Sequence, residues 1–379
     1  MLKRLIFSAL LLTTACEPID NLSDISNPES NSMGKFMGSG AHDPNEASYA
    51  KVLPQTPIVF PEDHQAHNDY RIEWWYLTAN LTTEQGESLG LQWTQFRVAT
   101  ATSPAPERES VNAPSPNAWA TEQLYLAHSA VTTQKQHLAS ERWSRGHPQL
   151  AGVASSPLRV FIDDWQWRSA SNDLFPATLN GRDEAFSYQL QLNSQAPYQL
   201  QGTNGYSIKS ADGTVASHYY SQPFIDVSGE VTIEGKVVPV TGQAWLDREW
   251  SSQFLTQGQQ GWDWFALRLN QDTALMLFQL RGDGSEQAHF YAGRLMHRDG
   301  QGESLTSSDI KVTALETHDI DGKTIPVAWQ VEVAKHQIDV TVSALNTNAL
   351  MPLSIRYWEG PVTLTGTHQG VGYMELTGY

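Results

Sequence analysis

The sequence contains one cysteine, Cys16, so no disulfide can form within the chain. It also has no long apolar run after its first residues, whereas a membrane-spanning helix needs about 18 or more. Basic residues are few: 24 Lys and Arg stand against 41 Asp and Glu, a formal net charge of −17. This excess of negative charge argues against nucleic acid or anionic lipid headgroups as partners.

Several catalytic signatures are missing as well. No Gly-x-Ser-x-Gly elbow, Walker loop or dinucleotide-binding glycine motif occurs, so nothing indicates a serine hydrolase or a nucleotide enzyme. His64 and His67 could form half of a metal site, but no carboxylates or thiolates at ligand spacing accompany them. The sequence therefore predicts neither a cofactor nor a metal.

The first residues are typical of an export signal. Lys3 and Arg4 precede an apolar run over residues 5–12 and small residues that end at Cys16. A lone cysteine at this point resembles a bacterial lipobox, so we expect 1–16 to be a lipoprotein signal with lipidation at Cys16. An ordinary signal cleaved nearby is the alternative. Glu17 favours the periplasmic face of the outer membrane, where acyl chains would anchor the protein in the cell envelope.

From about residue 70 onward the pattern is that of a β protein. Residues 17–55 lack hydrophobic periodicity and predict a flexible tether. Residues 186–192 then alternate with period two, and Asp-Gly pairs mark hairpin turns, as at 321–322. No sustained stripe with 3.6-residue spacing occurs, and residues 101–118 are typical of a long exposed loop. The prediction is an all-β fold.

Two signatures occur twice along the chain. The strand that begins at Trp75 and its partner, ending in Gln95-Phe-Arg97, match the segment from Trp264 to Arg281. Similarly, 229–247 resembles 360–375, so that Trp245 and Asp247 correspond to Tyr373 and Glu375. Chance likeness among strands is the alternative to a tandem duplication. Duplication predicts one barrel or sandwich in each half, with a boundary near 250–260.

Longer motifs then resemble a known family. The run His67-Asn-Asp-Tyr-Arg-Ile-Glu-Trp-Trp-Tyr76 is similar to the opening motif of the AttH-like and carotenoid 1,2-hydratase family. Further motifs follow in the family order: Gln201-Gly-Thr-Asn-Gly-Tyr206, Ala216-Ser-His-Tyr-Tyr-Ser221, Gly242-Gln-Ala-Trp-Leu-Asp-Arg-Glu-Trp250, Gly261-Trp-Asp-Trp-Phe265, Tyr357-Trp-Glu-Gly360 and 372–379. The resemblance implies two tandem lipocalin-like antiparallel β-barrels, which we assign to 56–255 and 256–379, and an apolar ligand in at least one barrel.

The resemblance also implies candidate site residues. Carotenoid hydratases add water across a terminal isoprenoid double bond, and the positions matching their site are His218, Tyr220, Trp245 and Asp247. A carboxyl in an apolar barrel has its pKa raised by desolvation, so Asp247 could protonate an alkene. His218 or Tyr220 could take the proton of water, and aromatic faces stabilise a cation.

Structural alternatives stand beside each assignment. Asp247 could pair with an arginine such as Arg71 or Arg97, and His218 could be a satisfied barrel histidine. Glu73, between apolar neighbours, is expected to have an arginine partner rather than a catalytic role.

Two functions follow from these observations, and a purely structural envelope protein is a third reading. The first is a periplasmic lipoprotein that binds an apolar lipid or isoprenoid in a barrel, with possible ABC transporter components as partners. The second is a hydratase that adds water to an isoprenoid double bond, with Asp247 as general acid.

Overall fold

The computed structural model describes residues 49–100, 121–256, 258–282 and 290–379, so Cys16, most of the expected tether and the loop at 101–118 lie outside it. Within these residues the chain forms two antiparallel sheets, and the helical parts are 3-10 turns such as η4 (Glu62–His64) and η5 (Ala334–His336). No helix of this part is long and apolar enough to cross a membrane.

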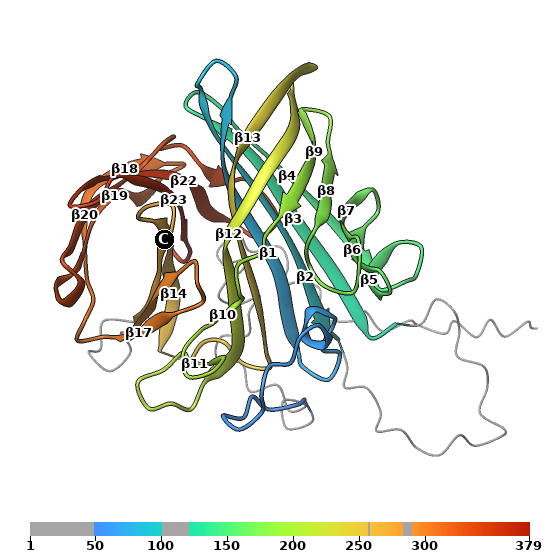
Figure 1. Cartoon of the computed structure of the whole chain (residues 1–379), viewed down its shortest axis with the longest axis horizontal. Helices are drawn as coiled ribbons and strands as arrows, with labels where there is room; N and C mark the ends of the chain where they lie inside the picture. The colour runs from blue at the N-terminus through green and yellow to red at the C-terminus, as the bar shows by residue number, and fades with distance from the viewer. Residues whose placement is uncertain (1–48, 101–120, 257, 283–289) are drawn as a thin grey trace, which may run out of the picture.

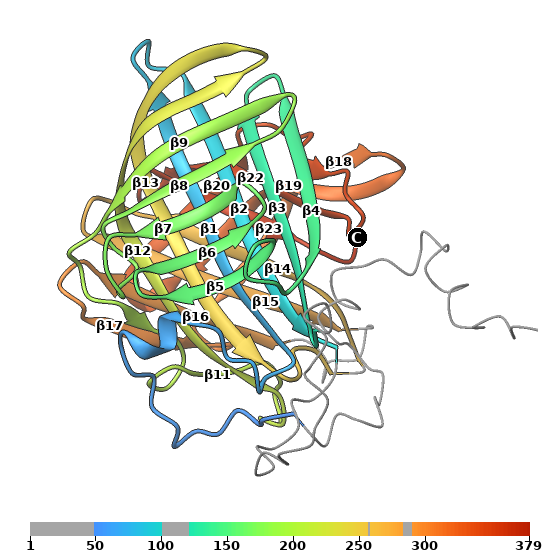
Figure 2. The same cartoon turned by 90° about the vertical axis from the view of Figure 1, so that its right-hand side faces the viewer.

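The first sheet has the order β4-β3-β2-β1-β13-β12-β9-β8-β7-β6-β5, with β10 and β11 pairing with β12. It curls so that β6 returns against β2, β3 and β4, and Figure 2 shows β5 to β9 crossing in front of β1 to β3. Its strands are β1 (Ile72–Thr83), β2 (Ser88–Ala99), β3 (Gln123–Thr133), β4 (His137–Arg145), β5 (Ala151–Ser155), β6 (Leu158–Ile162), β7 (Trp165–Ser169), β8 (Ala177–Arg182), β9 (Phe186–Asn193), β10 (Gln199–Leu200), β11 (Tyr206–Ile208), β12 (Ala216–Ile233) and β13 (Lys236–Ser251).

The second sheet has the order β17-β16-β15-β14-β23-β22-β20-β19-β18, with β21 pairing with β22. It curls beside the first sheet, as Figure 1 shows on the left. Its strands are β14 (Gln259–Arg268), β15 (Thr273–Gly282), β16 (Phe290–His297), β17 (Gly302–Thr306), β18 (Lys311–Ile320), β19 (Lys323–Val333), β20 (Ile338–Ala344), β21 (Leu350–Met351), β22 (Tyr357–Gly366) and β23 (Gly370–Leu376).

The all-β prediction and the two curled, barrel-like domains are confirmed. The strands of the two sheets fall on either side of residues 252–258, while the outer limits of each domain stay a prediction. The turn predicted at 321–322 joins β18 to β19 with Asp321 and Gly322 both at positive φ, 52° and 74°. That conformation suits a two-residue hairpin, which explains why Asp-Gly occurs there.

Three apolar clusters organise the molecule, and alternation along each strand decides which cluster a residue joins. On β1, Trp75 and Leu77 point into the core of the first sheet, whereas Trp74 and Tyr76 point toward the second sheet. On β14, Phe265 belongs to the core of the second sheet. The middle cluster lies between the two domains, where β1 meets β23 and β2 meets β22.

Candidate functional site

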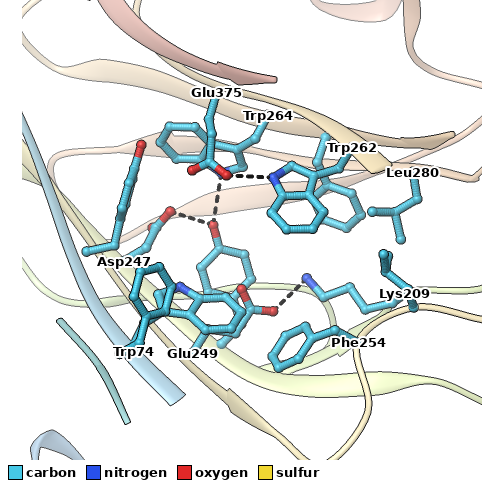
Figure 3. A pocket seen from close by; sticks show the side chains of 14 residues that line it. Trp74, Lys209, Asp247, Glu249, Phe254, Trp262, Trp264, Leu280 and Glu375 are labelled. Atoms are coloured by element: carbon cyan, nitrogen blue, oxygen red, sulfur yellow. Dashed lines mark hydrogen bonds and ion pairs between the residues drawn. The ribbon is translucent and has the colours of Figure 1, made fainter. Parts of the chain in front are cut away.

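A pocket opens between the two domains, within the middle apolar cluster (Figure 3). The pocket has a volume of about 680 Å³, which includes the open space at its mouth. Its walls are mainly aromatic and aliphatic, and its polar side chains come from both domains. The lining residues are Trp74, Tyr76, Phe96, Lys209, Tyr219, Asp247, Glu249, Phe254, Leu255, Trp262, Trp264, Phe278, Leu280 and Glu375.

Asp247 is the most deeply held carboxyl of this pocket, with 3 % of its surface exposed. Trp245 Nε1 donates to its Oδ1 over 2.8 Å and the Tyr219 hydroxyl donates to its Oδ2 over 2.8 Å; the Ser221 hydroxyl also donates to Oδ1. Among the described residues, no lysine or arginine forms an ion pair with Asp247. Burial raises the pKa of Asp247 to about 7 against the lowering effect of the three donors, and the nearby Glu249 adds to the rise. The alternative of an arginine partner is therefore wrong.

Glu375 is a second carboxyl in the same pocket, from the other domain. It accepts a hydrogen bond from Trp262 Nε1 over 2.8 Å. Burial raises the pKa of Glu375 to about 7, opposed by that bond, and the charges of Asp247 and Glu249 raise it further. Asp247 and Glu375 are therefore both partly protonated near neutral pH.

The remaining charges of the pocket neutralise each other. Lys209 Nζ lies 2.7 Å from Glu249 Oε1, and the hydroxyl of Ser217 donates to the same carboxylate. The Lys209 ammonium also lies over the rings of Tyr219 and Phe278, at 4.8 Å and 4.3 Å from their centres. Lys209 is thus occupied by Glu249, and no lysine or arginine of the described residues forms an ion pair with Asp247 or Glu375.

The four residues expected to share one site are separated by the sheet. Asp247 and Trp245 point to the pocket between the domains, so the expectation that Asp247 lies inside a barrel is wrong. On β12, His218 and Tyr220 lie opposite Trp250 and Arg248 of β13. These side chains point to the barrel side of the sheet, away from Asp247. The neighbouring side chains on β12, Tyr219 and Ser221, reach Asp247 instead, because successive residues of a strand alternate between faces.

The comparisons with known proteins agree with this architecture. A family model described as AttH-like matches residues 51–379. The chain belongs to the AttH-like family. A crystal structure reported as AttH from Nitrosomonas europaea shares 32 % identity and a TM-score of 0.76, covering 87 % of this chain and 99 % of that one. The resemblance drawn from the motifs is confirmed.

The AttH-like fold also matches kievitone hydratase from Nectria haematococca, at 14 % identity and a TM-score of 0.60. The match covers 87 % of this chain and 96 % of that one, and at this identity it shows a common fold alone. A search of curated proteins finds no significant match.

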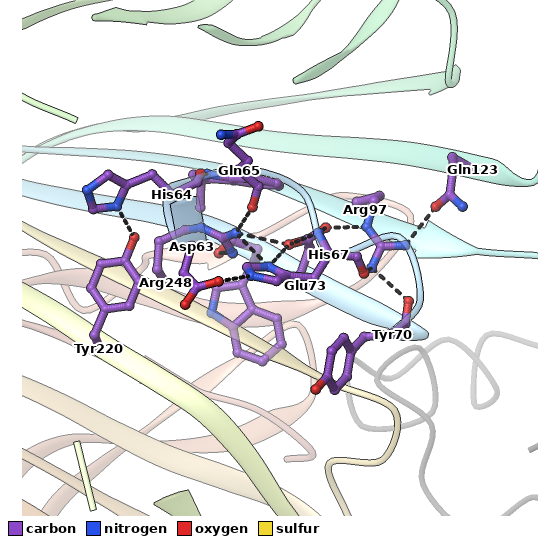
Figure 4. Close-up of polar contacts among 12 residues, drawn as sticks. Asp63, His64, Gln65, His67, Tyr70, Glu73, Arg97, Gln123, Tyr220 and Arg248 are labelled. Carbon is purple, nitrogen blue, oxygen red and sulfur yellow. Dashed lines mark hydrogen bonds and ion pairs between the residues drawn. The ribbon is translucent and has the colours of Figure 1, made fainter. Parts of the chain in front are cut away.

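On the barrel side of the first sheet, the AttH-like opening motif forms a buried ion-pair network (Figure 4). Glu73 is fully buried between Arg97, which contacts its Oε1, and Arg248, whose Nη2 lies 2.9 Å from its Oε2. His67 donates its backbone N–H to the same carboxylate. The two guanidinium groups hold the pKa of Glu73 well below its ordinary value despite burial. The expectation of an arginine partner for Glu73 is confirmed.

His67 of the AttH-like opening motif and His64, three residues before it, contact different aromatic side chains. His64 Nδ1 lies 2.7 Å from the Tyr220 hydroxyl, whereas His67 stacks on Trp250 with ring centres 3.9 Å apart. Within the described residues, no group of three or more His, Cys, Asp or Glu stands close enough to hold a metal ion. His218 packs edge-on against Tyr70, and burial lowers its pKa to about 4.

The raised pKa values give this AttH-like protein a testable pH dependence. Folding favours the protonated forms of Asp247 and Glu375, so their contribution to stability is complete below their ordinary values of 3.8 and 4.5. It is lost as the pH rises through about 7.

We therefore expect Asp247→Asn to stabilise the fold relative to wild type more at pH 8 than at pH 5, because the amide carries no charge at either pH. Urea denaturation at both pH values measures the difference. Glu184→Gln, a change at an exposed carboxylate, serves as the control and should show no such pH effect. An equal effect of Asp247→Asn at both pH values would contradict the assignment of a raised pKa.

Proposed function

We propose that this protein is a hydratase that adds water across a carbon–carbon double bond of an apolar, isoprenoid-type substrate bound between the two domains. The observation that carries the proposal is Asp247: a carboxyl that is 3 % exposed, lies in an aromatic pocket and has no cation partner in the part of the chain that the structure describes. Protonation of an alkene needs an acid that stays neutral until it reacts, and burial keeps a carboxyl in that state.

The surroundings of Asp247 fit the role of general acid. When the proton leaves for the alkene carbon, Tyr219, Ser221 and Trp245 already point their donors at the carboxylate that forms. Such preorganised donors stabilise charge at the moment it develops. The rings of Trp262 and Trp264 line the same space, and an aromatic face stabilises a nearby cation by about 0.5–2 kcal/mol.

The comparisons support the reaction class. The likeness to kievitone hydratase gives a common fold, and the motifs at 216–221 and 242–250 resemble those of carotenoid hydratases. We carry over to this chain only the class of reaction, which is water addition. The substrate of each relative is not carried over.

The test uses farnesol and geranylgeraniol as probes, incubated with the purified protein in H₂¹⁸O. The expected product carries one added water whose oxygen is ¹⁸O, detected by mass spectrometry, and heat-denatured protein forms none. Protein extracted directly from cells is analysed for bound lipids in parallel. Bound apolar molecules without any hydrated product from either probe would reject the hydratase and support a binding protein.

A binding protein is the second candidate because the pocket walls are largely apolar. In this proposal the chain is a periplasmic lipoprotein, anchored through Cys16 in the outer membrane, that shelters a lipid or isoprenoid. It would exchange this ligand with components of an envelope ABC transport system. If the lipid extract and both probes show no binding, neither candidate stands.

A further inference from the structure

We propose that Glu375 is the second catalytic carboxyl of this site: it takes a proton from the attacking water while Asp247 protonates the double bond. The inference rests on the proposed hydratase function and assigns a catalytic role to a residue of the second domain.

The argument starts from equivalent positions in the two sheets. Asp247 on β13 lies opposite Tyr76 on β1, and Glu375 on β23 lies opposite Trp264 on β14. In the duplicated signature, Glu375 stands where Asp247 stands, two residues after an aromatic side chain. Both strands turn this face toward the other domain, and Figure 3 shows both carboxyl groups directed into the same space.

The surroundings of the two carboxyls differ in a way that divides the roles. Asp247 accepts three hydrogen bonds, which stabilise the carboxylate that forms when it gives up its proton. Among the described residues Glu375 has one side-chain donor, Trp262, so more of its oxygen lone pairs are left to accept a proton from water. Glu375 is also half-buried rather than fully buried, which gives it the better access to water.

The electrostatics supply one acid and one base at neutral pH. Burial raises the pKa of each group to about 7; the charge of Glu249 adds to the rise at both, and the charge of Asp247 adds to it at Glu375. Near that pH the pair holds about one proton between its two members. A site with one neutral and one ionised carboxyl is the arrangement that acid–base catalysis requires.

The step balances without a further reactant. The Asp247 proton forms the new C–H bond with the electron pair of the alkene, which leaves a carbocation at the other carbon. A water oxygen forms the C–O bond to that carbon, and one water O–H bond breaks as its proton passes to Glu375. Exchange with solvent then returns a proton to Asp247 and removes one from Glu375.

Glu375→Gln is the test, made in the full chain with farnesol as the probe. We expect kcat to fall by about 10²–10⁴-fold with KM changed little, since an amide keeps the shape and cannot accept the proton. In wild type, the fall of the rate at low pH reports protonation of the base. The pH profile of the rate that remains in Glu375→Gln should therefore no longer fall at low pH. Asp247→Asn should instead remove the fall at high pH.

Glu359→Gln is the matched control. Glu359 faces Glu375 across β22 and β23, is buried, and accepts a hydrogen bond from the Tyr76 hydroxyl, but does not line the pocket. This variant should keep the wild-type kcat and both limbs of the pH profile, with only the midpoint of the low-pH limb moved, because the Glu359 and Glu375 carboxyls repel each other. Wild-type kcat in Glu375→Gln, or an unchanged low-pH limb, would overturn the role of Glu375 and leave the hydratase standing. A wild-type protein that hydrates no probe removes the proposed function and this role together.

Discussion

Asp247→Asn is expected to lower kcat for hydration of farnesol by about 10²–10⁴-fold, the usual contribution of a general acid. The amide has no proton to give to an alkene carbon, yet it can still accept from Trp245 Nε1 through its oxygen. Binding of the probe should therefore persist. Single-turnover kinetics in H₂¹⁸O, with probe affinity from tryptophan fluorescence, measures both quantities on the same preparation.

His218→Gln is the comparison that gives this result its meaning. His218 belongs to the motif that resembles the hydratase site, but its side chain lies on the other face of β12, against Trp250 and Tyr70. If the reaction takes place in the pocket between the domains, His218→Gln should retain the wild-type kcat. A cooperative thermal transition checks that this variant is folded. A loss equal to that of Asp247→Asn would place the chemistry on the barrel side instead.

Glu73→Gln is expected to cost about 3–5 kcal/mol of unfolding free energy, the typical loss when one partner of a buried ion pair is removed. Arg97 and Arg248 would remain buried with backbone carbonyls as their partners but without the carboxylate that pairs with both. Urea denaturation at neutral pH measures the loss. Because the folded-state pKa of Glu73 is depressed, the wild type should also lose this stabilisation in acid, below the ordinary value of 4.5.

Glu332→Gln provides the matched surface change. Glu332 pairs with Lys311 on β18 and β19, and the lysine side chain is 69 % exposed. Solvent screens such pairs, so no measurable loss is expected. If Glu73→Gln were as mild as Glu332→Gln, the buried network would have no structural role.

The sequence allowed the strands and turns to be predicted because their causes are local. Alternation at 186–192 and the left-handed preference of Asp321 and Gly322 act within a few residues. The repeat predicted from the sequence stays a prediction, and its alignment of the first signature is one residue out of register with the strand pairing. Trp75 was matched to Trp264, whereas pairing opposite Asp247 and Glu375 makes Tyr76 the equivalent of Trp264. A slip of one residue exchanges the two faces of a strand.

The site was harder to predict because spacing gives faces only within one strand. Residues two apart on a strand share a face, so the sequence correctly placed Trp245 on the same face as Asp247 and His218 on the same face as Tyr220. Whether the two pairs met depended on the register of β12 against β13, which sets Ser221 opposite Asp247. Tyr219 was therefore missed, although it lies between the two residues that were named. The pocket itself depends on how two sheets pack, for which the sequence holds no local signal.

The equivalence of Asp247 and Glu375 has a consequence for how such a site can arise. A symmetric dimer of one module would bring two copies of the same carboxyl together across its twofold axis, in identical surroundings. Joining both copies in one chain removes that constraint, because each position can then change alone. Among the described residues, three side chains donate to Asp247 and one donates to Glu375, an asymmetry that two identical subunits could not encode.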